Sequence, residues 1–139
     1  MIETQVTQRL VRLLNTVPGC RAKKRHGGRF QSGDPDIAGS YRGLAFFIEV
    51  KFPGGQLTLL QGHELARWAA SGAVALLGVA LPNANMLLVQ AITQTNWEQL
   101  AASKLPKIVN QAGWHNKARL DNPVELLSLI EKLHRDAAE

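Results

Sequence analysis

The stretch from Trp68 to Trp97 carries no charged residue, and this feature limits the folds open to the chain more than any other. A proline and two asparagines near position 83 interrupt it, so its apolar parts, Ala73 to Leu81 and Met86 to Ile92, are too short to cross a bilayer as helices. Their length suits buried strands joined by a turn. We therefore expect two core strands and no membrane partner.

Length and composition fit one globular domain. The 139 residues are 45% hydrophobic and 19% charged, close to the averages for soluble proteins. Cys20 is the single cysteine and cannot form an intramolecular disulfide, and the first residues show no basic region followed by an apolar run. We expect one domain, residues 1–139, in an intracellular, cytoplasmic protein.

Apolar spacing and capping residues predict four helices. The first begins near Ile2 and ends at Pro18-Gly19, the second begins after Thr58 and ends at Gly72, and a short third spans Asn96 to Ser103. The last follows Asn122 as N-cap and Pro123. We expect its buried stripe to comprise Val124, Leu127, Ile130 and Leu133. Residues 106–121 match no element, and the order of helices and strands predicts an α/β fold with a mixed sheet.

A strand from Cys20 to Arg25 and a hairpin precede the second helix. If Arg42-Gly43 is a two-residue turn, the strands Asp36 to Tyr41 and Leu44 to Phe52 pair so that Asp36 lies directly opposite Glu49. Successive side chains of a strand point to opposite faces of the sheet. Glu49 and Lys51 therefore lie on one face, and the apolar residues next to them in the sequence lie on the other.

Two carboxylates opposite each other repel and need a compensating charge. Lys51 supplies part of it, and a divalent cation held by Asp36 and Glu49 would supply the rest. Hard oxygen ligands of this kind suit Mg²⁺ or Mn²⁺. The alternative is a solvated polar face in which Lys51 only pairs with Glu49.

The positive charge is concentrated in the first part of the chain. Residues 1–51 hold nine Lys or Arg and four acids, and the remainder is balanced, within a net charge of +5. An anionic partner should therefore meet the first part, and nucleic acid is the leading candidate. The candidate phosphate contacts are Arg21, Lys23, Lys24, Arg25, Arg29 and Ser32. A solvated edge strand is the alternative explanation of the basic run, but its closeness in sequence to the proposed metal site favours phosphate contact.

Pro35-Asp36 followed by Glu49-Val50-Lys51 resembles the PD-(D/E)XK nuclease signature. The further Gly55-Gln56-Leu57-Thr58 with Gln61 is similar to the virus-type replication-repair nuclease branch, VRR-NUC. Archaeal Holliday-junction resolvases are a second family that the chain resembles. The resemblance covers about residues 1–92 and implies a restriction-endonuclease-like α-β-β-β-α-β core, with a C-terminal helical extension at about 93–139.

The resemblance implies a role for each matching residue. Asp36, Glu49 and the carbonyl of Val50 would bind the metal, and Lys51 would orient water or stabilise charge on the phosphate. Glu3 would complete the metal shell, although an acid in a first helical turn is also explained by the helix dipole. Gln61 would position water or phosphate, or serve only as the capping partner of Thr58.

The implied activity is metal-dependent hydrolysis of DNA to a 5′-phosphate and a 3′-hydroxyl. So small a domain offers little surface for reading bases, so we expect a structure-selective endonuclease that cuts branched, flap or Holliday-junction DNA. Resolvase-like relatives use two active sites, which implies a homodimer, and a phage-encoded protein acting in a bacterial host fits the VRR-NUC resemblance. A nucleic-acid-binding module without turnover is the alternative, and a sequence-specific restriction enzyme is disfavoured for lack of a recognition domain.

Overall fold

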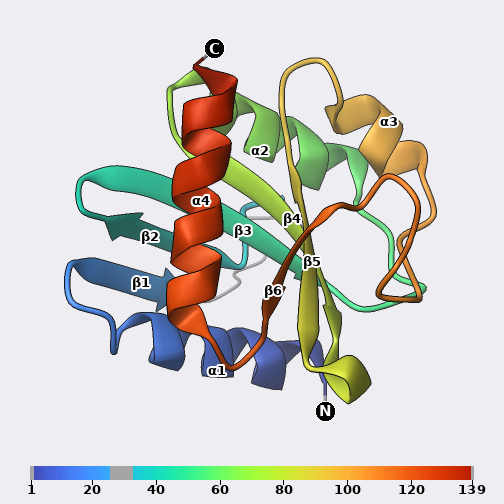
Figure 1. The fold of residues 1–139 in the computed structure, drawn as a ribbon. Coiled ribbons are helices and arrows are strands. Elements are labelled where there is room, and N and C mark those ends of the chain that lie inside the picture. Colours follow the sequence, from blue (N-terminus) through green and yellow to red (C-terminus); the bar gives the residue numbers. More distant parts are fainter. Residues whose placement is uncertain (1, 26–32, 139) are drawn as a thin grey trace.

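In the part of the chain that the structure describes, six strands form one mixed sheet in the order β1-β2-β3-β4-β5-β6, in which only the pair β3–β4 is parallel (Figure 1). The structure is a computed structural model that describes residues 2–25 and 33–138. The strands are β1 (Cys20–Lys24), β2 (Ile37–Tyr41), β3 (Leu44–Lys51), β4 (Val74–Leu81), β5 (Met86–Ala91) and β6 (Asn116–Arg119).

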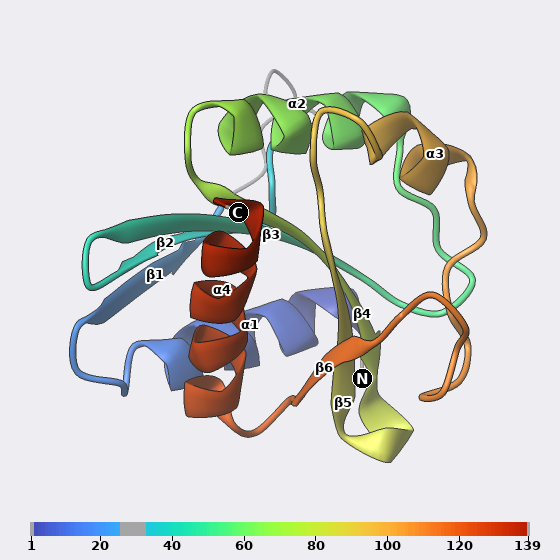
Figure 2. The ribbon, with the colours of Figure 1, turned by 45° about the horizontal axis from the view of Figure 1, so that its top comes forward.

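Helices cover both faces of this sheet. α1 (Glu3–Leu14) and α4 (Pro123–Ala137) pack on one face, and α2 (Leu59–Ala70) and α3 (Trp97–Ala102) lie over the other (Figure 2). α2 is the crossover that joins the parallel strands β3 and β4, as such a connection requires. The α/β fold with a mixed sheet is confirmed.

Strand alternation divides the core into two layers. Phe46, Ile48 and Val50 of β3 are buried with α1 and α4, whereas Phe47 packs against the layer under α2. All eight residues of β4 are buried, because this strand is central and covered on both sides. The uncharged stretch of the sequence is therefore largely the interior of the sheet.

Two expectations about the C-terminal part were wrong. The extension is not only helical, because β6 adds a sixth strand within the unassigned residues 106–121. Of the stripe expected on α4, Leu127 and Ile130 are buried and Leu133 packs against the core, but Val124 is 57% exposed and Leu126 is buried in its place. Position 124 lies in the first turn of α4. Within residues 2–25 and 33–138, no helix has the length and apolar character needed to cross a membrane.

Candidate metal and phosphodiester site

The β2–β3 hairpin has the predicted register. Tyr41 pairs with Leu44 and Ile37 with Ile48, which puts Asp36 level with Glu49. Arg42 and Gly43 both have positive φ, 50° and 84°, the conformation that a two-residue turn between twisted strands favours. The turn therefore fixes which side chains meet at the far end of the hairpin.

Asp36 is held by backbone contacts to both neighbouring strands. β2 begins one residue later, at Ile37, so the carboxylate of Asp36 takes the place of a strand partner for Val50, whose N–H donates to Oδ2 at 2.9 Å. On the other side, the N–H of Arg25 donates to the carbonyl oxygen of Asp36 at 2.8 Å. These contacts fix the Asp36 carboxylate next to the backbone of β3.

Glu49 is a carboxyl group inside the protein, only 3% exposed. Its Oε2 accepts a hydrogen bond from Nε2 of Gln61 at 3.1 Å and lies 3.7 Å from Nζ of Lys51. Burial raises the pKa of Glu49 to about 8, and the negative charge of Asp36 adds to the rise while Lys51 opposes it. Without a further cation the folded site therefore favours a protonated Glu49 at neutral pH.

The other oxygen of Glu49 is the observation that most favours a bound cation. Among the described residues, Oε1 is buried and has no hydrogen-bond partner. An unpartnered buried acceptor is costly, and a cation would satisfy it while reducing the repulsion between Glu49 and Asp36. The donor set of carboxylate oxygens beside a strand backbone fits a hard divalent ion such as Mg²⁺ or Mn²⁺.

The structure does not bring Glu3 into this group. Over residues 2–25 and 33–138, no three His, Cys, Asp or Glu side chains are arranged to hold a metal, so the carboxylates that meet are those of Asp36 and Glu49. Glu3 is exposed in the first turn of α1, where an acid is favoured by the helix dipole. Its role as a metal ligand stays a prediction.

Gln61 performs the capping function and contacts the site at the same time. Its Oε1 accepts from the N–H of Thr58 at 3.0 Å, and its own N–H donates to Oγ1 of Thr58 at 3.0 Å. Its Nε2 remains available to donate to Glu49. The cap therefore orients the amide toward the carboxyl group, and a role of Gln61 in positioning water or phosphate stays a prediction.

The basic run of the first strand is divided between the two faces of the sheet. Arg21 and Lys23 are exposed and share the face of Glu49, whereas Lys24 lies on the opposite face and is half-buried. Arg25 forms an ion pair with Asp34, with Nε 3.0 Å from Oδ2. Arg29 and Ser32 lie outside the described residues.

The loop after β3 is held by a hydrogen bond to a distant part of the chain, and the sequence did not indicate this contact. Nε2 of Gln56 donates to the carbonyl oxygen of Ala101, at the end of α3, at 3.1 Å. This contact joins residues 45 positions apart, so no local pattern could have indicated it. It holds the loop that follows Lys51 against the C-terminal part of the protein.

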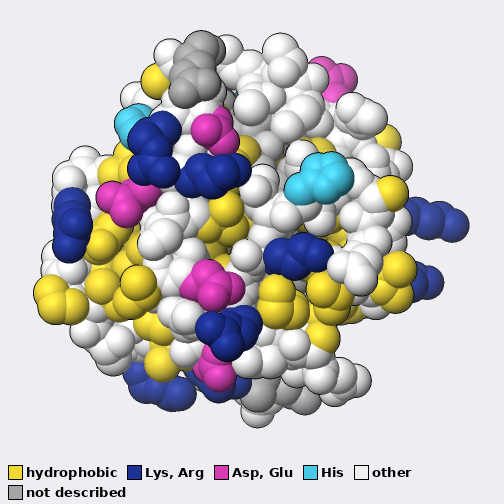
Figure 3. All heavy atoms as spheres, viewed as in Figure 1, with side chains coloured by type: hydrophobic (Ala, Val, Ile, Leu, Met, Phe, Trp, Pro, Cys, Tyr) yellow, Lys and Arg dark blue, Asp and Glu magenta, His cyan; other side chains and the backbone are white. Residues whose placement is uncertain are grey.

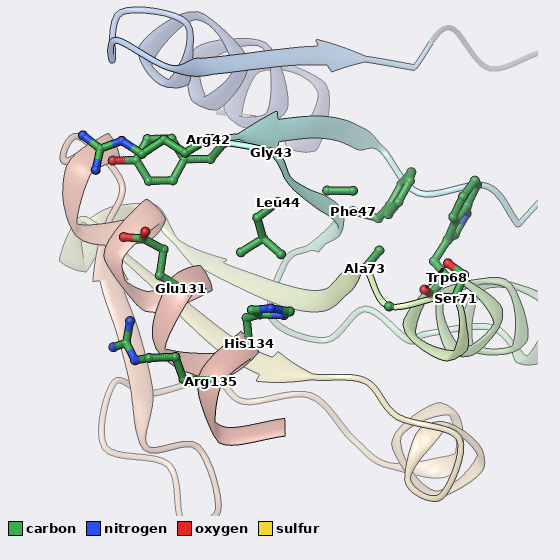
Figure 4. Close-up of a pocket in the computed structure, with 13 residues that line it drawn as sticks. Arg42, Gly43, Leu44, Phe47, Trp68, Ser71, Ala73, Glu131, His134 and Arg135 are labelled. Carbon is green, nitrogen blue, oxygen red and sulfur yellow. Dashed lines mark hydrogen bonds between the residues drawn. The ribbon is translucent and has the colours of Figure 1, made fainter. Parts of the chain in front are cut away.

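A cavity of about 600 Å³ lies at the other end of β3. Figure 4 shows it between Leu44 and Phe47 of β3, Trp68 of α2 and His134 of α4. Since Leu44 begins the strand and Lys51 ends it, this cavity is separate from the carboxyl groups. On the face covered by α4, acidic and basic side chains are interspersed (Figure 3), so the described residues form no continuous basic area there.

Comparison with known proteins gives a match in structure. No family model and no curated protein matches the sequence. A solved structure of Hjc from Archaeoglobus fulgidus, a Holliday junction resolvase from an archaeal hyperthermophile, superposes with a TM-score of 0.53. The two chains share a fold. Their sequences are 23% identical, over 64% of this chain and 76% of Hjc.

This match confirms the restriction-endonuclease-like fold expected from the resemblance to the PD-(D/E)XK superfamily. At this level of identity it establishes the fold alone. The VRR-NUC branch and the roles of the individual site residues stay predictions.

Proposed function

We propose that the chain is a metal-dependent DNA endonuclease that hydrolyses phosphodiester bonds with Mg²⁺ or Mn²⁺. The observation that carries this proposal is the buried Glu49 carboxyl group, whose Oε1 has no partner among the described residues and which lies level with Asp36. The two carboxyl groups repel each other unless a cation lies between them, and exposed basic residues lie on the same face of the sheet. This combination suits cleavage of a phosphate backbone.

Different residues of the chain would bind the cation, orient its ligands and stabilise the phosphate. Asp36 and Glu49, with the backbone of Val50, would hold the cation, and Gln61 holds Glu49 in the required orientation. Lys51, 13% exposed and beside Glu49, would stabilise the negative charge that develops on the phosphate. The cation, when bound, supplies activation of a water molecule and neutralises phosphate charge.

We further propose that the substrate is branched, flap or Holliday-junction DNA. The fold similarity to a Holliday junction resolvase supports this substrate class, as do Arg21 and Lys23, which face the same side of the sheet as Glu49. Contacts of this kind follow the backbone and carry no base information. Two strands cut at one junction would need two sites, which supports a homodimer, and Gly55-Gln56-Leu57-Thr58 with Gln61 supports the VRR-NUC branch.

The test is cleavage of linear, flap and four-way DNA in the presence of Mg²⁺ or Mn²⁺. Glu49→Gln, Asp36→Asn and Lys51→Ala should each lower the cleavage rate by at least about a hundredfold while DNA binding persists. The matched controls are Glu64→Gln, Asp136→Asn and Lys132→Ala, which change the same residue types in surface ion pairs. Equal activity in both sets would overturn the proposal.

A binding module without turnover is the second candidate. Among the described residues, only two carboxylates meet at the site, where a third acid was expected, and this favours a binding module. It predicts that the wild-type protein binds four-way DNA but leaves it uncut with either metal. Cleavage that depends on Glu49 would exclude it.

A further inference from the structure

A second cavity, of about 440 Å³, lies between the loop that follows β3 and the segment that follows α3. The loop contributes a glycine pair and an amide, and the segment contributes a hydroxyl group and two lysines. The residues in question are Gly54, Gly55, Gln56, Ser103, Lys104 and Lys107. The cavity thus combines parts of the chain that are about fifty residues apart.

The chemistry of its walls suits an anion. Lys104 and Lys107 are both exposed, and neither has an ion pair in the part of the chain that the structure describes. Among the described residues, no acidic side chain lines the cavity. By contrast, Lys132 on α4 lies 3.4 Å from a carboxylate oxygen of Asp136. Two ammonium groups without an ion pair among the described residues lie beside two adjacent glycines, which carry no side chain, so a phosphate group can approach this surface closely.

This cavity adjoins the proposed catalytic site. A Cβ atom placed on Gly55 would lie 3.8 Å from Cδ of Lys51, so one wall of the cavity lies against the lysine of the site. The hydrogen bond from Gln56 to the carbonyl oxygen of Ala101 connects the two walls. The position of the cavity relative to Lys51 is therefore set by direct contacts.

We propose that this cavity binds a backbone phosphate of the DNA strand, next to the linkage that is cleaved. The assignment rests on the proposed nuclease function and deepens it, because it adds a substrate contact from the C-terminal part of the chain. In the sequence, that part is electrically balanced, and the DNA contacts predicted from charge lie in the first 51 residues. The fold brings two of its lysines beside the loop that follows β3.

The first test measures the binding of a four-way DNA junction in EDTA, so that no cleavage occurs. Lys104→Ala with Lys107→Ala should weaken binding about tenfold at low salt and lower the slope of log affinity against log salt by about one, the value for one phosphate contact. Lys104→Arg with Lys107→Arg should retain the wild-type affinity. Lys132→Ala is the matched control and should change neither quantity. Wild-type affinity and slope in the double alanine variant would overturn the proposal.

The second test separates a direct contact from a general loss of charge. A series of DNA substrates carries one neutral methylphosphonate linkage at each position around the cleaved bond. Wild-type protein should lose affinity for the substrate that is neutral at the contacted phosphate, and the double alanine variant should show no additional loss there. Additive losses at every position, or binding of inorganic phosphate without any effect on DNA affinity, would contradict the assignment.

Failure of this proposal is distinguishable from failure of the proposed function. If the wild-type protein cleaves DNA and the lysine variants match it in affinity, only the cavity assignment is wrong. If the wild-type protein does not cleave DNA but the lysine variants lose affinity and salt dependence, the nuclease assignment is wrong and a backbone contact is retained.

Discussion

Among the residues that the structure describes, Glu49 is the one charged side chain that is buried. It is buried beside another carboxylate, and the lysine and the glutamine that contact it both approach the same oxygen, Oε2. Because its pKa lies near 8 in the absence of metal, a cation that binds there must replace a proton. Metal binding should therefore strengthen as pH rises toward 8.

The same pKa predicts how stability depends on pH in EDTA. The unfolded carboxyl group titrates near 4.5 and the folded one near 8, so between these values the folded state binds more protons. The free energy of unfolding should therefore fall as pH rises through this window, with a slope of at most about 1.4 kcal/mol per pH unit from this group. Urea unfolding at pH 5, 6, 7 and 8 measures it.

Glu49→Gln should flatten this dependence and raise stability at pH 8 in EDTA, whereas Glu64→Gln should keep the wild-type slope. Mn²⁺ should raise the melting temperature of the wild-type protein by several degrees at pH 8, and by less at pH 6. A wild-type protein whose stability rises from pH 5 to 8 in EDTA would show that Glu49 is ionised without metal.

At the scale of elements, the N-terminus of α2 links helix formation to the site. Thr58 and Gln61 cap the helix by reciprocal hydrogen bonds, and the remaining donor of Gln61 contacts Glu49. The start of α2 therefore determines where the Gln61 amide lies. The cap of α4, in which Oδ1 of Asn122 accepts from the N–H of Glu125 at 3.0 Å, has no such connection.

We expect the two caps to differ in their effect on activity. Thr58→Ala and Asn122→Ala should each lower the free energy of unfolding by about 1 kcal/mol, the usual contribution of an N-cap side chain. Only Thr58→Ala should also lower the cleavage rate, about tenfold or less, because Gln61 would no longer be held toward Glu49. Denaturant unfolding and single-turnover cleavage measure the two effects. Equal activity in both variants would make the cap purely structural.

At the scale of the whole molecule, the sheet separates the two parts of the basic run. Arg21 and Lys23 lie on the face of the carboxyl pair, while α1 and α4 cover the opposite face. A DNA backbone that reaches Glu49 must therefore approach from the side of α2 and the open surface of β1. Long-range attraction to the net positive charge would assist this approach at low salt.

Arg21→Ala with Lys23→Ala should weaken DNA binding to a similar degree for junctions of different sequence, and lower the salt slope by about two. Lys132→Ala with Arg135→Ala removes the same charge from α4 and should have a smaller effect. Fluorescence anisotropy at several salt concentrations distinguishes them. An equal loss in both double variants would indicate attraction by net charge alone, without contact at β1.

Several features of the fold were predictable because their causes are local. The caps at Thr58 and Asn122 and the turn at Arg42-Gly43 depend on neighbouring residues, and each is present as expected. The stripe of α4 was misjudged because burial of Leu126 rather than Val124 depends on how the helix meets the sheet. Strand β6 escaped prediction since its four residues gain their structure from β5.

The sequence by itself determined the pairing of Asp36 with Glu49, because a two-residue turn and strict alternation along the strands leave a single register in which the apolar residues of β3 are buried. Tertiary structure decided how deeply Glu49 is buried, that Gln61 contacts it, and that the loop after Lys51 is held by α3. These contacts form only when α2 crosses over the sheet and the C-terminal segments pack beside it. Their strength depends on the exclusion of water by several elements together, which no short stretch of sequence specifies.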